Sequence, residues 1–313
     1  MGRGQGRTGA LIAAAATLLC GAAAPTEIPL REARWLLSPD VAADLTREPV
    51  ECRSHYPDPA LERSADIGKV AFSAPLLLGG QAARAGLSCS SCHSNGRANP
   101  HFHFPGISAD AGTADVTASL MSSHRGDGIF NPKTIPDLAG DPARLKISRD
   151  PQKEDLRKFI HGLITQEFDG PEPPPAVLDG LVAYVRSLSP ESCKGQSEGV
   201  RLAPILDQVA LAVRLGEQSY DAGDRATARV LIAAARSNLG RIDERFQTPS
   251  TSNSRALLRE ADADLKAIEL ADNPPPGGFA NWQRIWPARR EKLLAAEPRS
   301  LYSEAMLRRA LKN

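Results

Sequence analysis

The chain has 313 residues, of which 42% are hydrophobic, 24% charged and 5% aromatic, with 25 glycines and 25 prolines. This length suggests about two domains, and the apolar fraction is sufficient for ordinary cores, which excludes a disordered or collagen-like chain. Lys and Arg number 38 against 37 Asp and Glu, a formal charge of +1. The sequence therefore carries no general basic surface for nucleic acid.

Residues 1–23 are typical of a cleaved Sec signal peptide. Two arginines precede an uncharged apolar stretch at 11–19, and small residues follow it. We place cleavage after Ala23, because cleavage one residue later would leave a proline at the new terminus. We expect the mature protein to be exported and periplasmic.

Lipoprotein attachment through Cys20 is the less favoured alternative, because the preceding Leu19 is larger than the residue usual at such sites. The apolar stretch is shorter than a transmembrane anchor, and no later stretch is long and apolar enough to span a bilayer. We therefore expect no transmembrane segment.

Three regions follow the signal peptide. Residues 24–51 are expected to form an irregular lead-in that contains Trp35. Residues 52–193 contain every histidine and both outer cysteines, and 199–313 contain neither residue type. We interpret 52–193 and 199–313 as two domains of an all-α protein.

Apolar periodicity predicts several short helices in 52–193, separated by segments rich in Gly and Pro. A short helix capped by Asp115 and ending at His124 is also expected, whereas residues 94–113 are expected to be a loop. The other helices are predicted at 65–72, 86–93, 154–164 and 177–188.

Residues 199–313 contain three long apolar stripes at helical spacing, interrupted at 221–224, 248–254 and 273–278. Short breaks between such helices favour a hairpin or bundle of antiparallel neighbours. We expect this C-terminal domain to stabilise the protein or to dock a partner. Trp282 and Trp286 are expected in its core.

The Cys-Ser-Ser-Cys-His sequence at 89–93 is the strongest chemical signal. Thiols three positions apart lie about one helical turn from each other and so reach the two vinyl groups of a haem. The histidine after the second cysteine then ligates the iron. We predict one covalent haem c, with thioethers at Cys89 and Cys92 and His93 as the axial ligand. A Cys-x-x-Cys redox disulfide and half of a zinc site are the alternatives.

Cys52 and Cys193 lie at the two ends of the same region. In an oxidising compartment a bridge between them is favoured over two unrelated buried thiols. Closing so long a loop would stabilise the fold by about 4–5 kcal/mol in the chain-entropy model.

About residues 65–190 resemble the di-haem cytochrome c peroxidase and methylamine-utilisation (MauG-like) family of the cytochrome c superfamily. The residues that carry the resemblance are Gly68, Phe72, Pro75-Leu76, Ser88-Cys89, Thr134–Leu138 and the helix Leu181–Leu188. The resemblance implies a cytochrome c-like haem domain in which the last helix packs across the first. Here one haem motif stands where that family has two, and no tryptophan lies within 52–193.

Several residues are candidates for the sixth iron ligand. Met121 or His124 is favoured, because on a helix the two would share a face; a Met ligand raises the reduction potential and a second His generally lowers it. His101, His103 and an open or water-bound iron are the alternatives. His161 is expected to be a packing histidine and His55 a surface residue.

The surroundings of His93 follow from general haem chemistry. The outer nitrogen of a ligating histidine usually donates to a carbonyl. Pro105 has the spacing for this in cytochromes, with Pro100 as the alternative. Three arginines are candidates for the haem propionates, although ordinary surface charge is the simpler explanation for each: Arg97, Arg125 and Arg149.

These features favour a periplasmic electron carrier with one haem and an unknown redox partner protein. The alternative is a peroxidase-like enzyme with an open iron, for which Glu154, Glu167 and His124 are candidate acids or bases. A third possibility is a haem sensor or binding subunit whose C-terminal helices dock a partner.

Overall fold

The computed structural model describes residues 30–117, 120–271 and 274–311, so the predicted signal peptide and Cys20 lie outside the described residues. The described chain is all-α, as predicted, with four very short strands. Its α-helices are α1 (Val41–Thr46), α2 (Pro59–Phe72), α3 (Gly80–Ala85), α4 (Cys89–Cys92), α5 (Asp155–Gly162), α6 (Pro175–Ser187), α7 (Leu202–Asp221), α8 (Arg225–Arg245), α9 (Ser252–Leu270), α10 (Gly278–Ala296) and α11 (Glu304–Ala310).

The strands form two antiparallel pairs, β1 (Arg47–Pro49) with β4 (Ser197–Gly199) and β2 (Thr113–Ala114) with β3 (Lys133–Thr134). A π-helix, η5 (Leu163–Glu167), continues α5. The 3-10 helices are η1 (Arg31–Trp35), η2 (Pro75–Leu77), η3 (Ser94–Gly96), η4 (Pro142–Arg144), η6 (Pro190–Ser192), η7 (Pro249–Thr251) and η8 (Glu297–Arg299).

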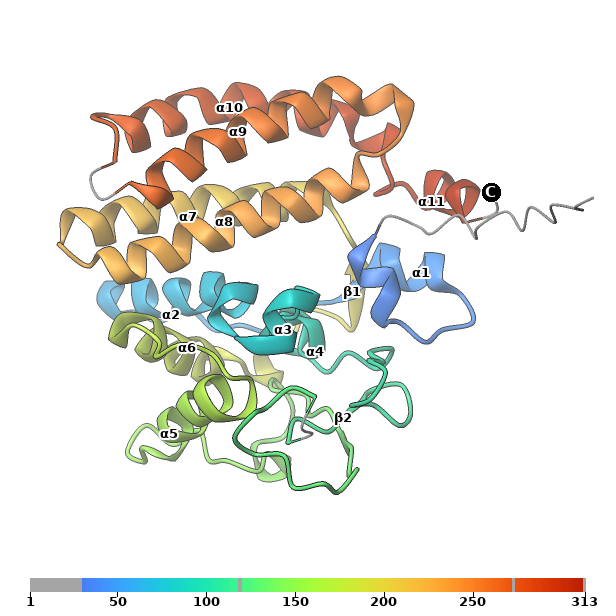
Figure 1. The fold of residues 1–313 in the computed structure, drawn as a ribbon, viewed down its shortest axis with the longest axis vertical. Helices are drawn as coiled ribbons and strands as arrows, with labels where there is room; N and C mark the ends of the chain where they lie inside the picture. Colours follow the sequence, from blue (N-terminus) through green and yellow to red (C-terminus); the bar gives the residue numbers. More distant parts are fainter. Residues whose placement is uncertain (1–29, 118–119, 272–273, 312–313) are drawn as a thin grey trace, which may run out of the picture.

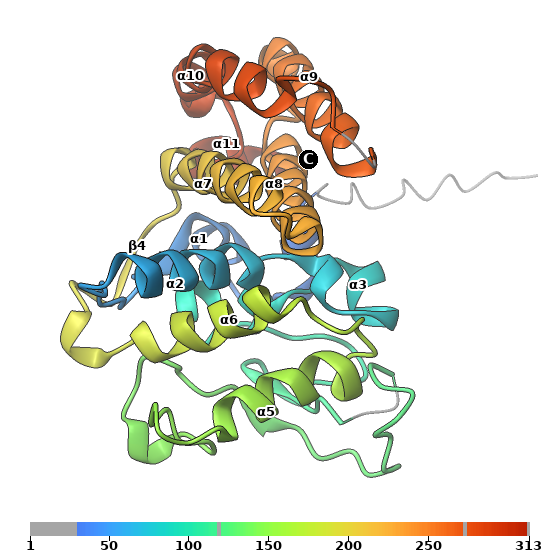
Figure 2. The same ribbon diagram turned by 90° about the vertical axis from the view of Figure 1, so that its left-hand side faces the viewer.

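The helices are stacked in layers (Figures 1 and 2). The pair α9 and α10 lies on the pair α7 and α8, which lies on α2; α6 lies below α2, and α5 below α6. One continuous hydrophobic core runs from Ile67 on α2 to Tyr302 near the C-terminal end. The two proposed domains thus share a core across α2, and where their boundary falls stays a prediction.

Helices α2 and α6 cross at a pair of glycines. A Cβ atom at Gly68 would lie 1.9 Å from the carbonyl oxygen of Gly180, so only a residue without a side chain permits this approach. One turn further along, the rings of Phe72 and Tyr184 meet edge to face, 5.2 Å apart. The last helix of the 52–193 region therefore packs across the first, as the family resemblance implied.

The long helices of 199–313 follow the apolar stripes seen in the sequence. Leu206, Leu239 and Leu265 are buried between them. Trp282 and Trp286 are core residues, as expected, with stacked rings 4.6 Å apart. Short turns join α7 to α8 and α8 to α9, and these neighbouring helices pack against each other in antiparallel pairs, as the sequence favoured.

The lead-in is more ordered than the sequence suggested. It contains η1, α1 and β1, and its Leu30 and Leu45 pack against Leu301 and Leu307 from the other end of the chain. For the described residues 30–51 the expectation of an irregular lead-in was wrong, because these short elements gain their stability from partners remote in sequence.

Two predictions in the middle region also need correction. The described residues 115–117 and 120–124 form turns, not a helix ending at His124. Asp115 accepts from Thr117 and Asn131 and so stabilises a loop. The helix predicted at 86–93 begins only at Cys89, because Gly86 adopts a left-handed conformation (φ 73°) that ends α3. None of the described helices has the length and apolar character needed to cross a membrane.

Candidate functional site

Helix α4 presents the two cysteines of the motif. Ser88 and Ser91 form a capping box that fixes the start of this short helix. Cys89 and Cys92 are three positions apart, about one turn, and neither is in a disulfide. Burial raises the pKa of Cys89 to about 11 and that of Cys92 to about 12. Redox-active Cys-x-x-Cys thiols have lowered pKa values, so these protonated thiols do not support that alternative.

His93 ends α4 with its ring held in one orientation. Its Nδ1 lies 3.1 Å from the carbonyl oxygen of Pro136. A carbonyl oxygen can accept a hydrogen bond but cannot donate one. Nδ1 therefore carries the proton, and in the neutral ring Nε2 keeps a lone pair for a metal. Burial lowers the pKa of His93 to about 4, which favours this neutral form.

The carbonyl that orients His93 was predicted wrongly. Pro105 and Pro100 are both exposed, and the Pro100 oxygen instead faces Gly112, where an added Cβ would lie 3.0 Å from it. The loop after the motif turns towards η1, since the amide of His103 donates to Trp35. Pro136 takes the expected role of Pro105 or Pro100, because the segment that contains it folds back against His93.

An apolar cluster lies beside Cys92; we call it the Cys92 cluster. Met121 belongs to it and is 1% exposed. The remaining buried members are Leu78, Ala82, Leu87, Phe102, Ile107 and Ile135, and the partly buried ones are Trp35, Ala85, Cys92, Ala98, Phe104, Ala114 and Phe168. Such a wall excludes water and suits a large apolar group attached to the adjacent thiols.

Met121 and His124 do not share a face. While Met121 is buried in the Cys92 cluster, the His124 side chain is 63% exposed, with its Nδ1 2.9 Å from a carboxylate oxygen of Asp169. The difference follows from the turns that replace the expected helix.

The other histidines lie in different surroundings. His101 faces Asp44 at 3.2 Å, and His55 is a surface residue, as expected, with Nδ1 2.7 Å from Glu62. His161 was expected to pack in the core, but its Nε2 lies 2.8 Å from the exposed Glu172. That expectation was wrong, because the His161 side chain is 37% exposed near the end of α5.

The arginines considered for propionates have protein partners. Arg97 forms an ion pair with Asp137, and Arg125 lies 3.3 Å from Glu167. Arg149 donates to the backbone carbonyls of Leu138 and Leu188.

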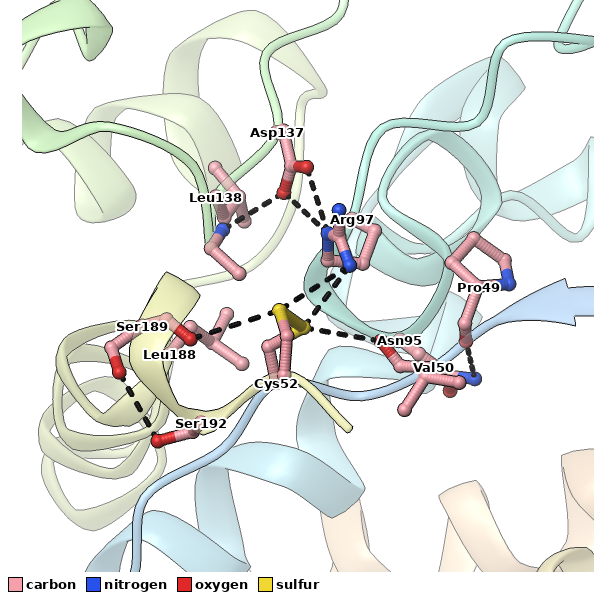
Figure 3. The surroundings of a disulfide bond; sticks show 12 residues. Pro49, Val50, Cys52, Asn95, Arg97, Asp137, Leu138, Leu188, Ser189 and Ser192 are labelled. Carbon is pink, nitrogen blue, oxygen red and sulfur yellow. Dashed lines mark hydrogen bonds and ion pairs between the residues drawn. A yellow bond between two sulfur atoms is a disulfide. The ribbon is translucent and has the colours of Figure 1, made fainter. Parts of the chain in front are cut away.

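The predicted Cys52–Cys193 disulfide is confirmed, and Figure 3 shows its surroundings. It joins the segment before α2 to the segment after α6. Arg97 donates to both sulfur atoms, so this bridge lies close to the motif loop.

Sequence reasoning missed Asp137 and the role of the Pro136 carbonyl. The resemblance at Thr134–Leu138 was the available signal, but it indicated fold and not a contact with His93. Among the residues the structure describes, no three His, Cys, Asp or Glu side chains form a group that could hold a metal ion, so the zinc alternative gains no support. Comparison with family models, curated proteins and solved structures finds no match.

Proposed function

We propose that this protein is an exported c-type cytochrome with a single covalent haem that transfers one electron at a time. The observation that carries the proposal is the arrangement of 89–93: two free thiols one helical turn apart, followed by a histidine whose Nδ1 is engaged and whose Nε2 is left for a metal. Cys89 and Cys92 would hold the haem through thioethers, and His93 would ligate its iron.

A bound haem supplies an iron that alternates between the ferric and ferrous states. The protein's own residues orient the group and keep water from it. Pro136 fixes the plane and tautomer of His93, and Phe72 lies beside that ring, 6.4 Å between centroids. The Cys92 cluster lowers the polarity next to the thiols, which bears on the reduction potential.

The helix crossing supports the cytochrome c-like fold within this proposal. Gly68, Phe72 and Tyr184 bring the first and last helices of 52–193 together next to His93. The C-terminal helices α7 and α8 pack on the side of α2 that faces away from α6.

We propose Met121 as the sixth ligand in preference to His124. Met121 is buried in the cluster against which Cys92 packs, whereas the ring of His124 is exposed and paired with Asp169. A thioether ligand favours the ferrous state, so a high reduction potential is expected.

The peroxidase alternative rests on a specific observation at Glu167. This side chain is buried, its Oε2 has no hydrogen-bond partner, and burial raises its pKa, although nearby Arg125 acts in the opposite direction. Glu154 is exposed, and His124 is paired with Asp169. Of the three residues considered, Glu167 is therefore the one favoured as an acid.

The purified, exported protein tests the proposal directly. We expect a coloured protein, heavier than the processed chain by one haem, with a low-spin spectrum and a sulfur-to-iron band. Met121→Ala should abolish that band, and His124→Ala should leave it unchanged. A high-spin ferric spectrum that changes with peroxide, and is altered by Glu167→Gln, would favour the peroxidase. A colourless protein of apo mass would refute both.

A further inference from the structure

We infer that Arg97 is a positioning residue for His93: together with the Cys52–Cys193 disulfide, it holds the Pro136 carbonyl against the histidine ring. The contacts belong to the protein itself, while the effect on a reduction potential rests on the proposed function.

The first link joins Arg97 to the segment that orients His93. Arg97 Nε lies 2.8 Å and 2.7 Å from the two carboxylate oxygens of Asp137. Asp137 directly follows Pro136, whose carbonyl accepts from His93 Nδ1. The Leu138 amide also donates to the carbonyl of Gly96, next to Arg97, at 3.1 Å. Movement of Arg97 would therefore move the carbonyl that fixes the imidazole.

The second link joins Arg97 to the disulfide (Figure 3). Its Nη1 lies 3.0 Å from Cys52 Sγ and 3.6 Å from Cys193 Sγ. Its side chain is only 16% exposed, so its choice of partners is restricted. Because the guanidinium is planar, contact with sulfur at one edge fixes the direction of Nε towards Asp137. A lysine has one ammonium and cannot make both contacts in this way.

Packing at the end of α6 holds the same loop. Leu188 is fully buried against Gly96, where an added Cβ would lie 2.5 Å from the leucine side chain. The Ser189 amide donates to the Cys52 carbonyl at 2.8 Å. The bridge thus ties both the arginine and the packed chain end to the loop after His93.

The expected effect has a definite sign. An acceptor at Nδ1 makes the imidazole a better electron donor and so favours ferric over ferrous iron. Loss of positioning weakens this bond and raises the reduction potential. Loss of the positive charge of Arg97 alone would instead lower the potential, since a nearby cation disfavours the more positive ferric iron.

The test is a double-mutant cycle on the holoprotein, read as the midpoint potential of the haem. We expect Arg97→Gln to raise the equilibrium constant for reduction about tenfold, which is about 59 mV for a one-electron couple. Cys52→Ser/Cys193→Ser should raise it in the same sense, and the combined variant should shift by less than the sum. Additive shifts, or a lower potential in Arg97→Gln, would overturn the inference.

Two further variants sharpen the test. Arg97→Lys keeps the charge and should still raise the potential; a wild-type potential in this variant would show that charge alone matters. This variant also decides the question if the serine variant does not fold. Arg157→Gln removes an exposed ion pair with Asp179 on α6 and should leave the potential unchanged.

Failure of the proposed function can be told apart from failure of this inference. If the full chain carries no haem, the readout becomes the nitrogen-15 NMR signature of the His93 ring. The proton should reside on Nδ1 in the wild type and lose that preference in Arg97→Gln. An unchanged tautomer would overturn the inference, whereas a colourless protein by itself refutes only the cytochrome proposal.

Discussion

Residues 52–193 and 199–313 are both helical, but different interactions hold them together. In 199–313, long helices bury regular apolar stripes such as Leu206, Leu239 and Leu265. In 52–193, short helices and loops are held by individual contacts: a disulfide, an arginine that contacts it, and a glycine crossing. We therefore expect single substitutions at these contacts in 52–193 to have larger effects than substitutions on the exposed faces of the long helices.

The largest effect is expected at the helix crossing. Gly68→Val should destabilise the protein by at least about 3 kcal/mol, because the new side chain would collide with the Gly180 carbonyl and force α2 and α6 apart. Denaturant unfolding measures the loss. If the proposed haem is bound, its visible spectrum should change too, since Phe72 next to His93 moves with α2. Wild-type stability in this variant would show that the crossing is loosely packed.

A core truncation in the C-terminal helices should destabilise without touching the motif. Leu265 on α9 is fully buried, so Leu265→Ala should cost about 2–5 kcal/mol through lost burial and a cavity. If the proposed haem is bound, its spectrum and midpoint potential should remain those of the wild type. A shifted potential would show that the C-terminal helices influence the motif through the core that the two regions share.

A pH-dependent link joins the lead-in to α8. Glu32 pairs with Arg241 and Arg245; although its burial acts in the opposite direction, these arginines lower its pKa from 4.5 to about 2. A lowered folded-state pKa adds stability above the unfolded value, and this is lost as pH falls from about 4.5 towards 2.

Glu32→Gln should therefore cost about 1–2 kcal/mol near neutral pH, after allowance for its partial exposure, and progressively less towards pH of about 2. Urea unfolding at several pH values measures the difference from wild type. Glu304→Gln removes an exposed carboxylate of α11 and is the matched control. A cost that does not change with pH would refute the linkage.

The smallest effect is expected from a glycine substitution in 199–313. Gly240 on α8 is exposed and has nothing within 4 Å of an added Cβ. Gly240→Ala should stabilise the protein by about 0.5–1 kcal/mol, because alanine is the better helix former. A loss of stability measured by thermal unfolding would indicate a contact at this face.

Prediction from the sequence succeeded for features that depend on local residue spacing or on the pairing of cysteines. The long helices followed from apolar residues at helical spacing, and the disulfide from two cysteines at the ends of one region in a chain that we expect to be exported. The expected helix ending at His124 failed, because Asp115 uses its carboxylate to stabilise a loop with Asn131. No local periodicity reports that contact.

By itself, the sequence determined the all-α character, the helices of 199–313, the pairing of Cys52 with Cys193 and the thiol–thiol–histidine order at 89–93. Only the tertiary structure decided that Pro136 orients His93, that Met121 is buried while His124 is exposed, and that Arg97 lies between the disulfide and Asp137. The reason is physical: helix periodicity and the spacing within a motif act over a few residues, whereas these contacts join atoms from segments about 40 or more residues apart, whose approach depends on the packing of the whole core.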